Sequence, residues 1–152
     1  MINFREITEK NLKSIIDLNV KEDQKDQVAP NSVSISQGHY SKSAWFKGIF
    51  NDDIPVGFVM LDLIEEENKC FLWRFMIDCK YQGNGFGKIA LTQVIDYVKS
   101  LNIFQEIKTS YVPSENSAKG FYKNFGFIKS KEVIKDFGLE DSDEIGMKYL
   151  LK

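Results

Sequence analysis

Apolar residues recur along the chain with two different spacings, and stretches of one spacing alternate with stretches of the other. Together they predict a protein of mixed helices and strands. Apolar side chains at every second position, or in short unbroken runs, are typical of strands. Such stretches occupy Ile2–Ile7, Ala44–Phe50, Ile54–Ile64, Cys70–Asp78, Ile107–Val112, Phe127–Val133 and Ile145–Leu151. Apolar side chains three or four positions apart predict helices beginning at Glu9, at Ser32–Tyr40, at Lys88–Leu101 and from Pro113 to Phe125. This order predicts an α/β protein with a mixed sheet and helices on both of its faces.

The composition is that of an ordinary globular domain. The chain has 152 residues, of which 43% are apolar and 28% charged, and these values exclude disorder and fibrous repeats. The chain has no internal repeat, low-complexity tract or linker, so we expect residues 1–152 to form a single domain. The net charge of −2 gives no support for nucleic-acid binding.

Neither a membrane span nor a metal centre is expected. No apolar run approaches the roughly 18 residues that a span needs, and the charged N-terminus is not a signal peptide, so a cytoplasmic location is predicted. His39 is the only histidine, which excludes a zinc site built from several histidines. Cys70 and Cys79 form no C-x-x-C motif, and we interpret them as reduced thiols.

The stretch Gln82–Lys88 is the most informative one for function, because it places three glycines between a buried strand and a helix. Such a loop exposes backbone N–H groups at a helix N-terminus, where they suit a phosphate or pyrophosphate. A Walker A loop is excluded because Ile89 stands where serine or threonine is required, and a dinucleotide fingerprint because the glycines are spaced two apart. A tight turn without a ligand is the alternative.

The spacing within this loop carries a resemblance to a known family. The pattern [QR]-x-x-G-x-[GA] is matched by Gln82, Gly85 and Gly87. A second signature, from a helix into a strand, is matched by Ala118, Tyr122, Gly126 and Phe127. With the order of elements, these motifs resemble the GNAT superfamily of acyl-CoA-dependent N-acyltransferases over essentially the whole chain. Within it, Trp73–Asp78 and Val28–Asn31 resemble bacterial spermine/spermidine (diamine) acetyltransferases.

The resemblance implies a fold and a set of residues for coenzyme A. The fold is a mixed, mostly antiparallel central sheet of about seven strands. A bulge near Met76 or Ile77 splays its strand from Ile107–Val112, and CoA lies along the freed edge. The implied CoA-binding residues are Phe75, Met76, Ile77, Gln82, Gly83, Asn84, Gly85, Phe86, Gly87, Lys88 and Asn116. The family usually places its asparagine seven residues before the tyrosine, where this chain has Glu115, so Asn116 is displaced by one position.

Tyr122 is the candidate general acid, because a phenol can protonate a leaving thiolate. Its helical spacing with other apolar residues is equally typical of a core tyrosine. No general base is assigned: related polyamine acetyltransferases carry an acidic residue where this chain has Trp73. The candidates that remain are Asp78, Glu22, Asp23, Asp62, the run Glu65–Glu67 and a water relay. His39 is more typical of a satisfied polar residue than of a base.

Aromatic and acidic residues are candidates for the acceptor pocket. Trp73 and Trp45 attract ammonium groups if they face the pocket, and pack in the core if they do not. The acidic runs Glu65–Glu67 and Glu140–Glu144 either draw in a polycation or form solvated loops. Nothing pairs Cys79 with a base, which favours direct transfer to the amine over a covalent route.

The resemblance implies an enzyme that uses acetyl-CoA, without a metal, to acetylate a primary amine of a small molecule. A polyamine such as spermidine or spermine is the first choice of acceptor. The alternatives are an aminoglycoside, an amino acid or a protein amine as acceptor, and a CoA-binding sensor without catalysis. A homodimer is a further implication, since the final strands of such proteins often pair between subunits.

Overall fold

A computed structural model describes residues 1–151, and its centre is one seven-stranded sheet. The strands are β1 (Ile2–Arg5), β2 (Ala44–Asn51), β3 (Ile54–Ile64), β4 (Lys69–Ile77), β5 (Glu106–Tyr111), β6 (Ile128–Lys129) and β7 (Ile145–Leu150). They lie in the order β1-β2-β3-β4-β5-β7-β6, and only the pair β4–β5 is parallel. The mixed, mostly antiparallel sheet expected from the sequence is therefore confirmed.

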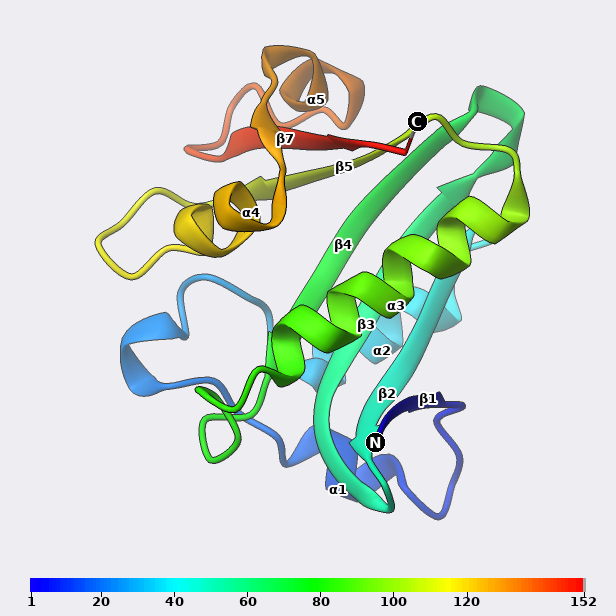
Figure 1. Cartoon of the computed structure of the whole chain (residues 1–152), viewed down its shortest axis with the longest axis vertical. Coiled ribbons are helices and arrows are strands. Elements are labelled where there is room, and N and C mark those ends of the chain that lie inside the picture. The colour runs from blue at the N-terminus through cyan, green and yellow to red at the C-terminus, as the bar shows by residue number, and fades with distance from the viewer. Residues whose placement is uncertain (152) are drawn as a thin grey trace.

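Helices cover both faces of the sheet (Figure 1). On one face α3 (Phe86–Leu101) buries Leu91, Val94 and Val98 in the larger core, which also receives Tyr122 of α4 (Lys119–Phe125). On the other face lie α1 (Leu12–Ile16) and α2 (Asn31–His39), where Ile15 packs with Phe58 in a smaller core. A fifth helix, α5, spans Lys131–Asp136, and the 3-10 turns η1 and η2 span Glu22–Gln24 and Glu65–Glu67. None of the described helices is long and apolar enough to cross a membrane.

Strands β4 and β5 diverge, and the divergence creates the opening in which the site lies (Figure 1). Along β3 and β4, Met60 pairs with Arg74 and Leu61 with Leu72, which leaves Trp73 as the extra residue of a β-bulge. The only ladder pair between β4 and β5 is Phe71 with Lys108, and the Thr109 hydroxyl donates to the Leu72 carbonyl at 3.1 Å beside it. Beyond these contacts β4 runs free of β5. The expected bulge is present, but it lies at Trp73 and not at Met76 or Ile77.

The predicted helix from Pro113 to Phe125 is wrong in its first half, because α4 begins only at Lys119. Serine and asparagine precede it, and their side chains compete with helical hydrogen bonds. The N–H of Ser117 instead donates to the carbonyl of Ser114 at 3.3 Å and closes a turn. Gly126 ends the helix with φ at 123°, as its place in the motif indicated.

The predicted strand Phe127–Val133 is also largely wrong. Only Ile128–Lys129 forms a strand, and α5 follows it. Val133 is fully buried beside Gly146 of β7, where an added Cβ would lie 2.7 Å from the Cβ of Val133. At the N-terminus, the predicted helix begins at Leu12 and not at Glu9, because Thr8 forms a turn with Asn11.

Candidate active site

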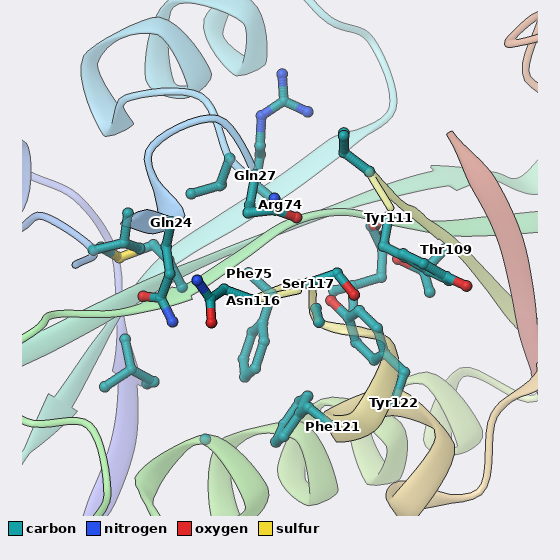
Figure 2. Close-up of a pocket in the computed structure, with 18 of the residues that line it drawn as sticks. Gln24, Gln27, Arg74, Phe75, Thr109, Tyr111, Asn116, Ser117, Phe121 and Tyr122 are labelled. Carbon is teal, nitrogen blue, oxygen red and sulfur yellow. Dashed lines mark hydrogen bonds between the residues drawn. The ribbon is translucent and has the colours of Figure 1, made fainter. Parts of the chain in front are cut away.

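A cavity of about 1020 Å³ occupies the gap between β4 and β5 (Figure 2). Its walls come from β4, β5, the glycine loop, the start of α4 and the segment Val20–Pro30, which we call the strap. The volume is at the upper end of the range for small-molecule and cofactor sites. The cavity is therefore large enough for a ligand of cofactor size together with a second small molecule.

The glycine loop ends at the N-terminus of α3, where backbone donors face an open space. Gly85 is the N-cap residue and has a φ of 78°, and Gly83 has a φ of 83°. No side chain caps the helix, and the first of its N–H groups to bond within it belongs to Ile89, which reaches the Gly85 carbonyl at 3.2 Å. The N–H groups of the preceding turn are available to an anion. Lys88, an exposed side chain, adds a positive charge at the same rim.

The structure brings together nearly all the residues that the sequence assigned to CoA and catalysis. Those that line the cavity are Phe75, Met76, Ile77, Gln82, Gly83, Gly85, Phe86, Gly87, Lys88, Asn116 and Tyr122. Asn84 lies outside this lining, and its side chain donates to the carbonyl of Tyr81 at 3.0 Å. The functional roles of all these residues stay predictions.

The backbone of β4 offers its free donors on alternate residues. The N–H of Asp78 bonds to Val56 of β3, and the carbonyl of Met76 lies against Gly57 of the same strand. By alternation, Phe75 and Ile77 direct their N–H groups into the gap with β5. The N–H of Ile77 therefore faces the cavity, whereas the N–H of Met76 faces β3.

Tyr122 both lines the cavity and belongs to the core, so its place in the core does not exclude the predicted role as general acid. Its side chain is 6% exposed and packs against Phe121 and Phe127. Burial raises the pKa of Tyr122 to about 12, and a side-chain hydrogen bond with Thr109 acts in the opposite direction. Tyr122 is consequently a neutral phenol near pH 7, able to donate a proton into the cavity (Figure 2).

The strap crosses one side of the cavity and is tied to its walls by side-chain hydrogen bonds. Gln82 donates to the Oε1 atom of Gln24 and to the carbonyl of Ile77, both at 2.9 Å. Asn116 donates to the carboxylate of Asp23 at 3.1 Å. Two residues that the sequence assigned to CoA thus hold the strap, a role that the sequence pattern did not reveal.

The structure separates the candidates for the acceptor pocket. Trp73 lines the cavity, whereas Trp45 stacks on Tyr97 with ring centroids 4.8 Å apart. Among the carboxylates proposed as bases, Asp78 is buried and accepts the backbone N–H groups of Asn19 and Lys80. Glu22, Asp23, Asp62, Glu65–Glu67 and His39 do not line the cavity.

The sequence reasoning missed the position of Glu144. This half-buried residue lines the cavity, and its Oε1 atom accepts a hydrogen bond from the Ser110 hydroxyl at 2.8 Å. The sequence marks it only as one member of the acidic run Glu140–Glu144, for which attraction of a polycation and a solvated loop are both open. No local spacing marks it, because the pairing of β5 with β7 carries it to the site.

Comparison with known proteins identifies the family. The model of the acetyltransferase (GNAT) family matches residues 10–127, which is more than half of the chain. The chain belongs to the GNAT acetyltransferase family. This GNAT acetyltransferase is 32% identical over 141 residues to the spermine/spermidine N(1)-acetyltransferase of Bacillus subtilis, a match that covers 87% of this chain and 91% of that protein.

Solved structures show the same GNAT fold. A GNAT-family acetyltransferase from Staphylococcus aureus covers all of both chains at a TM-score of 0.72 and 22% identity. The spermidine N-acetyltransferase of Vibrio cholerae, solved with CoA and spermine, has a TM-score of 0.74 at 14% identity and covers 99% of this chain and 95% of that chain. At these identities the likeness establishes the architecture, in which the donor-rich loop, the open strand edge and Tyr122 surround one cavity.

Proposed function

We propose that this GNAT enzyme transfers an acetyl group directly from acetyl-CoA to a primary amine of a polyamine such as spermidine or spermine. The observation that carries the proposal is a single cavity that joins the glycine loop at the start of α3 to the hydroxyl end of Tyr122. The same cavity therefore offers a site for an anionic cosubstrate and a proton donor. We expect residues 1–152 to form a single domain that contains the whole site.

The donor side of the cavity fits acetyl-CoA. The free N–H groups at the start of α3 and the ammonium of Lys88 are suited to a pyrophosphate. The N–H groups of Phe75 and Ile77 face the gap, where they are suited to an amide-rich arm lying alongside β4 as an extra strand. Acetyl-CoA supplies the activated acetyl group, and these residues hold and orient it.

The chain must also manage two protons on the acceptor nitrogen. An amine of pKa near 10.4 needs roughly 4–5 kcal/mol to be neutral at pH 7. One proton leaves to water before attack, and the neutral amine then forms the C–N bond as the C–S bond breaks. The amide nitrogen releases a second proton to water, and Tyr122 protonates the departing thiolate and regains a proton from solvent. The sum is one amide, one thiol and one released proton.

The polyamine acceptor is supported by the relative and by the cavity. The spermine/spermidine N(1)-acetyltransferase of Bacillus subtilis matches most of this chain. Trp73 offers an aromatic wall for alkylammonium groups in the cavity. Aminoglycosides, amino acids and protein amines are the competing acceptors. A CoA sensor without catalysis has less support, because binding CoA does not need the phenol of Tyr122 in the cavity wall. A homodimer and a cytoplasmic location stay predictions.

The test is thiol release from acetyl-CoA by the purified protein with a panel of amines. Spermidine and spermine are expected to have a higher kcat/KM than a monoamine of similar length. If an aminoglycoside, an amino acid or a peptide N-terminus exceeds spermidine by an order of magnitude, the polyamine assignment is wrong. Absence of thiol release with every amine would refute the catalytic proposal and leave a binding protein.

A further inference from the structure

The residues that line the cavity come from both faces of the sheet. Phe75 and Ile77 belong to the core beneath α3, and Phe75 stacks on Phe121 at 6.0 Å. Met76 belongs to the other core, and Arg74 donates to Gln37 of α2 at 3.1 Å. Figure 2 shows Arg74 directed toward the α2 side and away from Phe121 and Tyr122. All but Gln37 line the cavity, so it reaches both faces between β4 and β5.

Glu144 lies on the α2 face of this opening. Along β5, Tyr111 is buried in the core that contains Tyr122, and Thr109 bonds to Tyr122 itself. Ser110 lies between them and therefore points to the opposite face, where its hydroxyl donates to Glu144. Strand β5 thus separates the Glu144 carboxylate from the Tyr122 hydroxyl. The two groups bond to neighbouring residues of that strand, Glu144 to Ser110 and Tyr122 to Thr109.

The carboxylate of Glu144 forms no salt bridge with any of residues 1–151, and Arg74 is the cation whose charge it influences. Other partly buried carboxylates next to the same strands are paired: Asp136 with Lys108 and Lys69, and Glu106 with Lys148. Asp26, the other carboxylate in the lining, is exposed on the strap. Glu144 is therefore the half-buried carboxylate of the cavity whose charge is left for a ligand to neutralise.

Arg74 faces Glu144 without pairing with it. Burial lowers the pKa of Arg74, and the charge of Glu144 acts in the opposite direction. Its guanidinium is held elsewhere, by the Trp73 carbonyl at 3.0 Å and by Gln37, and it lies 5.7 Å from the centre of the Trp73 ring. The two terminal guanidinium nitrogens are held by these partners, the Nε atom is buried without a partner, and no salt bridge joins Arg74 to Glu144. An incoming ammonium therefore has access to the carboxylate.

We propose that Glu144 binds a non-reacting ammonium group of the acceptor and so selects amines that carry a second positive charge. This inference rests on the proposed function. The reacting nitrogen must become neutral, and a carboxylate beside it would favour its protonated form. A second ammonium gains from the same carboxylate, because it stays charged throughout the reaction. Glu144 is accordingly a specificity-determining residue, and its position on the α2 face places the tail of the acceptor there.

The test compares 1,4-diaminobutane with butylamine, which have the same carbon chain and differ by one ammonium group. Glu144→Gln keeps the shape and the oxygen that accepts from Ser110, and removes the charge. We expect kcat/KM for the diamine to fall at least tenfold while the value for butylamine and the KM for acetyl-CoA stay within twofold. Asp143→Asn, at an exposed neighbour outside the cavity lining, is the matched control and should change neither amine.

An equal loss with both amines, or no loss with either, would overturn the proposal. If Glu144→Gln does not fold, Glu144→Asp decides, because it keeps the charge one methylene farther away. It should reduce kcat/KM for the diamine alone, and an equal effect on both amines would again contradict the role. If the wild-type enzyme acetylates no amine, the proposed function fails. Calorimetry of 1,4-diaminobutane binding to the complex of the protein with CoA then tests Glu144 by itself. Equal affinity in the wild type and in Glu144→Gln would contradict the inference.

Discussion

Gly85→Val perturbs the proposed pyrophosphate site at the point where its geometry is most specific. Gly85 has a φ of 78°, and a Cβ built on it meets no atom within 4 Å, because the position faces the open cavity. A side chain there would occupy the space assigned to the ligand. The left-handed backbone costs an L-residue about 1–2 kcal/mol, and a β-branched residue more. This strain is present whether or not a ligand binds, so a control must reproduce it.

Gly138→Val provides that control, since Gly138 has a φ of 64°, is equally open and lies outside the cavity lining. Both variants should lose at least about 1–2 kcal/mol of stability, a fall in Tm of about 2–8 °C for a chain of this size. Only Gly85→Val should weaken acetyl-CoA binding, measured by calorimetry, by at least about tenfold, which equals about 1.4 kcal/mol. A folded Gly85→Val with wild-type affinity, or an equal loss in Gly138→Val, would refute the reasoning.

Three further predictions concern the phenol, the pH range and the strap. Tyr122→Phe should lower kcat while the acetyl-CoA affinity stays nearly unchanged; a wild-type rate would reassign Tyr122 to the core alone. Burial raises the pKa of Cys70 from 9.0 and of Tyr122 from 10.0, each to about 12. The unfolded chain therefore loses these protons first, so the stability they contribute is full below about pH 9 and is lost toward pH 12. Urea unfolding should show this fall, and Tyr122→Phe should remove the part above pH 10; a flat profile contradicts it. Gln24→Ala should speed hydrogen exchange in the strap at an almost unchanged Tm, and unaltered exchange would show that its bond to Gln82 is unimportant.

Local chemistry was enough to predict the elements that build the donor side of the site. The strand Ile54–Ile64 has the predicted bounds, because a long apolar run between turn residues has one stable solution. The glycine loop was recognised because positive φ angles need glycine, and Gly83 and Gly85 adopt them. The helix after the loop was predicted two residues short, since a helix start without a capping side chain gives no local signal.

The acceptor side depends on long-range packing, which the sequence pattern does not record. Helix α5 forms where a strand was predicted, because Val133 finds its partner in Gly146 of a strand farther along the chain. The bulge lies at Trp73 and not closer to the loop, because its position depends on the pairing between β3 and β4. Glu144 reaches the cavity through the pairing of β5 with β7, and the sequence alone left the acidic run Glu140–Glu144 open between attracting a polycation and forming a solvated loop.

Initial rates measured over a grid of acetyl-CoA and spermidine concentrations, with the product identified by mass spectrometry, test the central claim most directly. The two cosubstrates are proposed to meet in one cavity, with transfer straight from thioester to amine. Double-reciprocal plots should therefore give intersecting lines, with one acetyl group on spermidine for each thiol released. Parallel lines, acetylated protein in place of acetylated spermidine, or no spermidine-dependent thiol release would contradict the account.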